Sequence, residues 1–83
     1  MKIFLENSAQ NFYSELKFIE KIIDIFVSDS ADNAISIAAE KGDKLCVQKS
    51  GNFARITYSF TAEFFRGILI LFSNKDKTDF EIT

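Results

Sequence analysis

The chain of 83 residues contains no histidine, tryptophan or proline, and its only cysteine is Cys46. Histidine is the commonest general base near neutral pH and a frequent metal ligand. Its absence excludes Ser-His and Cys-His nucleophile pairs and metal sites built on imidazole. A lone cysteine cannot form a disulfide within the chain, so the fold requires no oxidising compartment. The sequence therefore predicts a protein that is not an enzyme and that uses no cofactor or metal.

The charge is balanced, with ten basic and twelve acidic residues and a net charge of −2. Proteins that bind nucleic acid usually carry a basic excess, so this balance argues against such a partner. The longest apolar run, Ile68–Phe72, is far shorter than the roughly 20 residues that span a bilayer. Near the N-terminus, Glu6 interrupts the apolar segment Ile3–Leu5, which does not match a signal peptide. We expect a cytoplasmic protein without membrane contact.

The length predicts a single domain over residues 1–83. Hydrophobic residues make up 47% of the chain, and ten of them are phenylalanines, which bury large areas without adding polar atoms. A chain of this size buries only about 60% of its unfolded surface. Its core must therefore be efficient, or a partner must complete it.

The first long segment has apolar residues at helical spacing. Asn7 as N-cap and Gln10 three residues later form a capping-box pattern. Beyond them the apolar residues recur at spacings of three and four, which places them on one helix face. This stripe consists of Phe12, Leu16, Ile19, Ile23 and Phe26. The sequence predicts one long helix from Asn7 to about Val27.

Phe18, Ile22 and Ile25 form a second apolar stripe beside the first. Together the two stripes cover about 200° of the helix, whereas about 100° is enough to face one core. Either a curved sheet wraps around the helix and covers both stripes, or the second stripe contacts a partner.

The remaining chain has the patterns of strands. Ile3–Leu5 is a candidate first strand, and Ala31–Lys41 fits either a helix or the first arm of a hairpin, with the strand favoured. Leu45–Gln48 and Ala54–Phe60 alternate apolar and polar residues around a turn at Lys49–Asn52.

Two further strands are expected near the C-terminus. Phe64–Phe72 is apolar on both faces, as in a strand that is covered on both sides or that offers one face to another subunit. Phe80 and Ile82 suggest a short last strand. The predicted fold is α+β, with one long N-terminal helix packed on a curled antiparallel sheet of four to five strands.

This order of elements resembles that of cystatin-like proteins. The resemblance covers the order of elements only, and one such topology hosts unrelated functions. Cystatins use a Gln-x-Val-x-Gly hairpin to block cysteine proteases. The corresponding hairpin here, Val47–Gly51, reads Val-Gln-Lys-Ser-Gly, so the resemblance does not imply protease inhibition.

Two groups of residues carry weaker signals. Glu15 falls inside the apolar arc of the predicted helix, where it would either pair with Arg55 or Arg66 or act as a desolvated catalytic acid. Phe53 and Arg55 share a strand face that would resemble a stacking platform for single-stranded nucleic acid.

The sequence predicts a protein–protein interaction module of the adaptor, inhibitor or immunity type. The expected contact residues are Phe18, Ile22, Ile25, Phe64 and Phe65. Its partner is another protein, and a symmetric homodimer is the companion hypothesis. The alternatives are a carrier of small apolar ligands with a phenylalanine-lined pocket and, less favoured, a nucleic-acid-binding domain.

Overall fold

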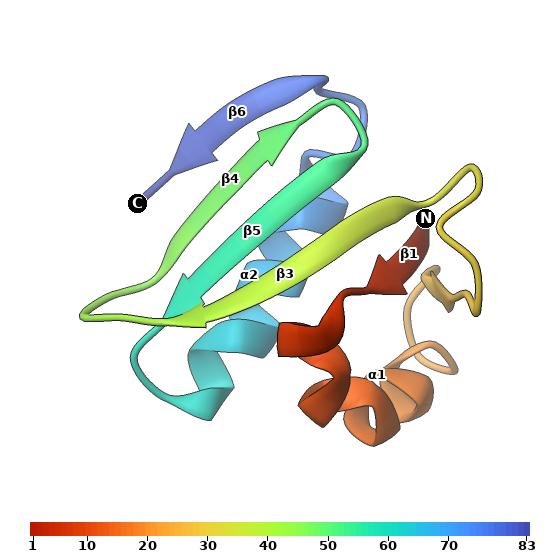
Figure 1. The fold of residues 1–83 in the computed structure, drawn as a ribbon, viewed down its shortest axis with the longest axis horizontal. Helices are drawn as coiled ribbons and strands as arrows, with labels where there is room; N and C mark the ends of the chain where they lie inside the picture. The colour runs from red at the N-terminus through yellow and green to blue at the C-terminus, as the bar shows by residue number, and fades with distance from the viewer.

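The computed structural model describes residues 1–83 as a six-stranded mixed sheet with two α-helices and one 3-10 helix (Figure 1). The elements in chain order are β1 (Lys2–Leu5), the 3-10 helix η1 (Asn7–Phe12), α1 (Tyr13–Ile19), β2 (Phe26–Val27), β3 (Ile35–Lys41), β4 (Cys46–Ser50), β5 (Phe53–Tyr58), α2 (Thr61–Ser73) and β6 (Asp79–Ile82). The predicted α+β class is confirmed.

The sheet has the strand order β2-β1-β3-β5-β4-β6. β1 runs parallel to both β2 and β3, and β3 runs parallel to β5. Only β4 is antiparallel to its neighbours, β5 and β6. The expectation of a purely antiparallel sheet is therefore wrong, and with a second helix before the last strand the cystatin-like order does not hold either.

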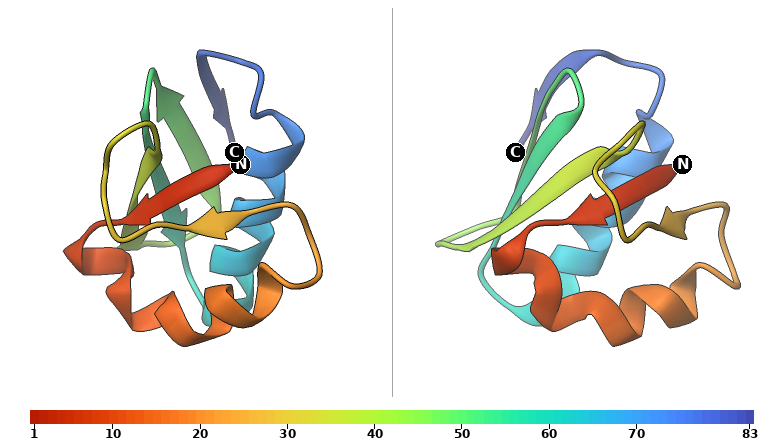
Figure 2. Two further views of the ribbon diagram at one scale, coloured as in Figure 1. Left: turned by 90° about the vertical axis from the view of Figure 1, so that its right-hand side faces the viewer. Right: turned by 45° about the vertical axis from the view of Figure 1, so that its right-hand side comes forward.

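Both α-helices lie on the same side of the sheet, and the other face of the sheet is uncovered. α2 lies behind the central strands in the view of Figure 1, and α1 crosses below β1 at the end of the sheet in Figure 2. Alternation along β5 follows this layering, because Ala54 and Ile56 are buried while Phe53 and Arg55 are exposed. The covered face carries the apolar residues, as expected for a sheet with one face in water.

One apolar core lies between the sheet and the helices. Its largest fully buried side chain is Phe64 of α2, whose ring stacks on that of Phe12 with a centroid distance of 4.0 Å. Tyr58 and Phe65 meet the same two rings edge-on, at 5.6 to 6.0 Å. Aromatic pairs in these geometries are favourable beyond the area that they bury.

The predicted hairpin is formed by β4 and β5. Ser50 pairs with Phe53, so Gly51 and Asn52 make the turn, and Gly51 has a φ of 59°. A positive φ at the first turn residue is typical of a type II′ turn, which glycine adopts without steric strain. The predicted turn is confirmed.

The helix predicted from Asn7 to Val27 is wrong in extent. It is divided into η1 and the seven-residue α1, and the chain then turns into β2. The N–H of Phe26 donates to the Met1 carbonyl and that of Ser28 to the Ile3 carbonyl, both at 2.8 Å. Because Phe26–Val27 pairs with β1, this segment is a strand and does not continue the helix.

The capping box is also absent. Asn7 lies inside η1, whose N-cap is Glu6 without a side-chain bond, and the Gln10 amide donates instead to the Leu5 carbonyl at 2.7 Å.

Phe64–Phe72 is not a strand but the main part of α2. Its buried residues are Phe64, Gly67, Ile68 and Leu71. Spacings of three and four place these residues on one face toward the sheet, while Leu69 is 48% exposed on another. The run is apolar around most of the helix, so it satisfies a strand pattern equally well.

The segment Ala31–Lys41 contains a strand from Ile35 onward, as favoured. It is not a hairpin arm, however, because β3 pairs with β1 and β5 and not with β4. The last strand, β6, forms around Phe80 and Ile82 as expected.

Glu63 fixes the start of α2. Its Oε1 accepts hydrogen bonds from the Ser59 N–H at 2.7 Å and from the Ser59 hydroxyl at 2.8 Å. The bond from the Ser59 backbone is the main cause that lowers the pKa of Glu63 below its ordinary value of 4.5. A lowered pKa means that the charged form stabilises the folded state.

We expect Glu63→Gln to lower the melting temperature by a few degrees at about pH 7. A group with a lowered folded-state pKa contributes above its unfolded pKa and ceases to contribute as the pH falls through its folded pKa. The difference from wild type should therefore decrease as the pH falls below 4.5, the ordinary pKa of the group, measured by melting at neutral pH and at several acidic pH values. A difference that persists unchanged in acid would contradict this role of the carboxylate.

Candidate interaction surface

The structure separates the five predicted contact residues. Phe18 and Ile22 are the most exposed large apolar side chains of the chain, at 64% and 68%. Ile25 and Phe64 are buried, and Phe65 is half-buried against the core. Only Phe18 and Ile22 are fully available to a partner without a change of fold.

Phe18 and Ile22 lie one helical turn apart. The N–H of Lys21 donates to the Phe18 carbonyl at 3.2 Å, and that of Ile22 to the Ile19 carbonyl at 2.8 Å. Helical turns of the tighter i to i+3 type thus continue past the end of α1, so Ile22 follows Phe18 at a distance of about one turn along the chain. Ile19 and Ile23 flank them, half-buried against the core. We call Phe18 and Ile22 the Phe18–Ile22 surface.

The opposite flank of α1 is occupied by β2. Glu20 binds Lys17 at 2.8 Å and accepts the Val27 N–H at 3.0 Å. The hydrogen bond with Lys17 is the main cause that lowers the pKa of Glu20, and the same bond raises the pKa of Lys17. Residues 17 and 18 point about 100° apart on a helix, so Phe18 lies on a different side of α1 from Lys17.

Phe26 belongs to this second flank. It is 55% exposed, and its ring centroid lies 6.0 Å from the Lys17 ammonium. The sequence pattern had placed Phe26 in the core stripe, and no local signal distinguishes it from the buried members. It is separate from the Phe18–Ile22 surface.

Glu15 does not occupy a desolvated position. It is exposed and forms no ion pair with Arg55, Arg66 or any other residue. The expectations of burial and of a structural ion pair are both wrong, because the sheet does not wrap around this side of α1.

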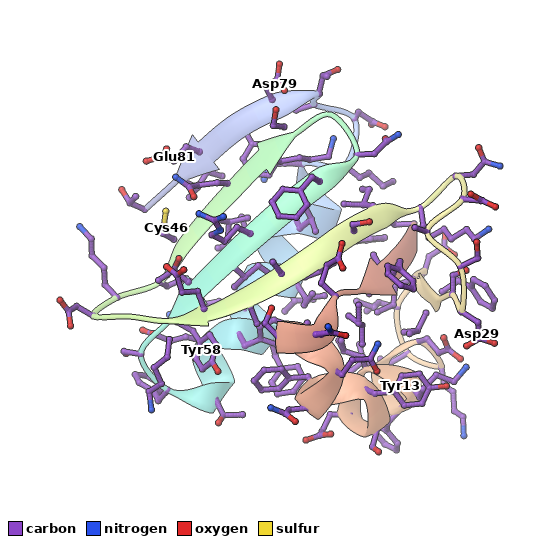
Figure 3. The ribbon with its side chains drawn as sticks, viewed as in Figure 1. Tyr13, Asp29, Cys46, Tyr58, Asp79 and Glu81 are labelled. Carbon is purple, nitrogen blue, oxygen red and sulfur yellow. The ribbon has the colours of Figure 1, made fainter.

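The uncovered sheet face carries a polar row across three strands. Arg55 pairs in register with Gln48, and Gln48 with Glu81, to whose carboxylate it donates at 3.1 Å. Figure 3 shows Glu81 on the edge strand together with Asp79. Beside the row is a shallow hollow of about 280 Å³, lined by Gln48, Lys49, Ser50, Phe53, Arg55, Phe80 and Glu81.

A second hollow, of about 190 Å³, lies at the start of α2 and is lined by Phe60, Ala62, Glu63 and Arg66. Both volumes are below the range of about 300–1,000 Å³ that is usual for small-ligand pockets. The phenylalanines of the core pack against one another, as Phe12 and Phe64 do. Neither of the two hollows lies between a helix and the sheet.

The structure brings together no group of three or more acidic or cysteine side chains that could hold a metal ion. Cys46 is a half-buried free thiol on β4, next to the buried Val47. None of the helices has the length and apolar character needed to cross a membrane.

Comparison with models of known protein families, with curated proteins and with solved structures found no match to this chain.

Proposed function

We propose that this protein is a non-enzymatic binding domain that contacts another protein chain through the Phe18–Ile22 surface. The observation that carries the proposal is the position of these two side chains. They are four residues apart, each is more than 60% exposed, and they lie on α1 and on the turns that directly follow it. Single exposed apolar residues are ordinary, but a contiguous pair with half-buried isoleucines beside it forms a patch.

The exposed apolar area of Phe18 and Ile22 is large enough to contribute to the free energy of binding. An aromatic side chain has about 200 Å² of surface. Covering the 64% of Phe18 that is exposed would therefore remove about 130 Å² from water, which is worth roughly 3 kcal/mol. Ile22 adds a second anchor one turn away. A few such residues commonly supply most of the binding free energy of an interface.

The test is capture from a lysate of the source cell with purified protein as bait, in which endogenous copies of the chain count as partners. We expect Ile22→Lys to reduce the captured protein at least tenfold, because an ammonium group cannot be buried without a counter-charge. Ile22 is 68% exposed, so the variant should fold, which circular dichroism and a cooperative melt will check.

Phe60→Lys is the matched control, since Phe60 is 59% exposed but lies before α2, on another element. It should capture as much protein as wild type. Equal capture by Ile22→Lys, or no specific capture by wild type, would contradict the proposal.

A further inference from the structure

We infer that the edge of β6 that faces away from β4, here called the β6 edge, is a docking site for an extended segment of another protein in which basic and apolar residues alternate. The segment adds a strand to the six-stranded sheet, antiparallel to β6. β6 and β2 form the two opposite edges of the sheet (Figure 1), and α1 leads into β2. The β6 edge is therefore separate from the Phe18–Ile22 surface and does not depend on the function proposed for it.

The two edges of the sheet differ in what covers their backbone. At the β2 edge, the N–H groups of Phe26 and Ser28 donate to β1, so the N–H of Val27 points outward. The Glu20 carboxylate accepts this N–H at 3.0 Å and closes the edge. At the other edge, β6 pairs with β4 alone, and no side chain bonds to the backbone of β6. Only the β6 edge is open to a further strand.

The free backbone groups of the β6 edge belong to Asp79 and Glu81. The Gly51 N–H donates to the Thr78 carbonyl at 3.0 Å, and hydrogen-bonded pairs recur at every second residue of an antiparallel ladder. Phe80 therefore bonds to β4, whereas the N–H and C=O groups of Asp79 and Glu81 point away from it. An antiparallel segment can exchange a pair of backbone hydrogen bonds with each of these two residues.

The side chains of β6 give the edge two different faces. Asp79 and Glu81 are exposed on the uncovered face of the sheet (Figure 3). Phe80 and Ile82 alternate with them and are half-buried on the covered face, where Phe80 packs against the core. A neighbouring strand directs its own side chains to the same two faces in turn. A segment with lysine or arginine opposite the carboxylates and an apolar residue between them is therefore complementary to the edge.

Both carboxylates of the β6 edge are available to a cation of a partner. Neither forms an ion pair within the chain. The Gln48 amide donates to one oxygen of Glu81 at 3.1 Å. The Gly51 N–H donates to one oxygen of Asp79, also at 3.1 Å. These bonds orient the two carboxylates and leave the second oxygen of each free, so the edge presents two oriented negative charges without a counter-charge.

Lys49 holds β6 in place on the covered side of the sheet. Its side chain is only 8% exposed, and its ammonium group donates to the Lys77 carbonyl at 2.6 Å, directly before β6. The segment that leads into β6 is thus fixed to β4. Because the edge is preorganised, the incoming segment alone loses conformational freedom when it docks.

A second copy of β6 does not fit the β6 edge. Residues that point their backbone outward pair with residues that do the same, so every antiparallel register of two β6 strands places Asp79 or Glu81 opposite a carboxylate. Like charges directly opposite one another are destabilising. The same two residues that disfavour self-pairing favour a basic segment.

Titration of the isotope-labelled full chain with two synthetic peptides, followed through its amide chemical shifts, tests this inference. The basic peptide is capped at both ends and alternates lysine with valine, and the acidic peptide has glutamate in place of lysine. We expect the basic peptide to shift the amides of Asp79 and Glu81 with a dissociation constant of about 0.1–1 mM. The acidic peptide should bind at least about tenfold more weakly.

Two methylated peptides distinguish strand addition from simple attraction between charges. Methylation of the lysine backbone nitrogens removes the donors that face Asp79 and Glu81, so binding should weaken at least about tenfold. Methylation of the valine nitrogens, which face away from β6, should change the affinity by less than about threefold. Both peptides carry the same charge as the parent.

The variant Asp79→Lys/Glu81→Lys should reverse the preference, so that the acidic peptide binds at least about threefold more tightly than the basic one. Asp29→Lys/Asp32→Lys is the matched control, because it makes the same change of net charge at exposed positions before β3. This control should still prefer the basic peptide. All four positions are exposed, so both variants should fold, as circular dichroism will check.

No binding of the basic peptide to wild type at about 5 mM would overturn the inference and show that the two acids only protect the edge from other chains. Equal binding of both peptides, or no effect of methylation at the lysine nitrogens, would also overturn it. Ile22→Lys should bind the basic peptide as wild type does, so the β6 edge and the Phe18–Ile22 surface succeed or fail separately.

Discussion

Replacing Phe64 by alanine is expected to lower the free energy of unfolding by about 3–5 kcal/mol. The side chain is completely buried, its ring stacks on Phe12 at 4.0 Å, and the rings of Tyr58 and Phe65 meet it edge-on. Alanine would leave a cavity and remove all three aromatic contacts. Because small domains are stable by only about 5–15 kcal/mol, the variant should be close to unfolding at room temperature.

Urea denaturation of wild type and variant measures this loss. Leu69→Ala is the matched control, because Leu69 lies on the same helix but is 48% exposed. It should lose less than about 1.5 kcal/mol, consistent with partial burial. If Phe64→Ala were as mild as Leu69→Ala, Phe64 would not be the centre of the core, and its predicted role as a contact residue would return.

Replacing Gly67 by alanine is expected to destabilise the protein by about 1–3 kcal/mol, although alanine is the better helix former by about 1 kcal/mol. A Cβ atom at Gly67 would lie 2.6 Å from Cγ2 of Ile56 and 3.3 Å from its Cδ1. Ile56 is fully buried on β5 and stiff at χ1, so it cannot move aside. Either α2 must lift from the sheet or the core must rearrange.

The same substitution in an Ile56→Ala background provides the control. Alanine at position 56 lacks the methyl groups that clash, so the added cost of Gly67→Ala should disappear or change sign in a double-mutant cycle. Additive losses in the cycle would show that the close approach of α2 to β5 does not limit the packing. Ala62→Gly, at an exposed position of α2, reports the helix-propensity effect alone.

Local pattern was sufficient where alternation and turn residues define an element without reference to its pairing partners. The β4–β5 hairpin, its glycine turn and the short strand β6 could be read from alternation and turn residues, and each forms at or close to its predicted position. The strand preferred within Ala31–Lys41 is confirmed from Ile35 onward. The strands that pair with β3 could not be predicted, because parallel pairing joins segments that are distant in sequence.

Local pattern failed where two structures fit the same residues. The run around Gly67 is apolar around most of the helix, so periodicity cannot distinguish a covered strand from a buried helix. Packing decides, because Phe64, Ile68 and Leu71 share one helical face against the sheet and Gly67 allows the close contact with Ile56.

The candidate surface shows the same division. Phe18, Ile22 and Ile25 form one stripe on an ideal helix, yet Ile25 is 5% exposed while the other two are open to solvent. The stripe is divided because α1 ends at Ile19, the turns that follow it end at Ile23, and the chain then joins β1 through the backbone of Phe26 and Ser28. No residue near Ile25 predicts that the helical turns end there.

By itself, the sequence determined the α+β class, the hairpin and the lack of histidine chemistry, because each depends on composition or on residues a few positions apart. Only the tertiary structure decided the mixed sheet, the identity of α2 and which apolar side chains remain exposed. These features depend on hydrogen bonds and packing between distant segments, whose energies can override local preference and cannot be read from any single window of the chain.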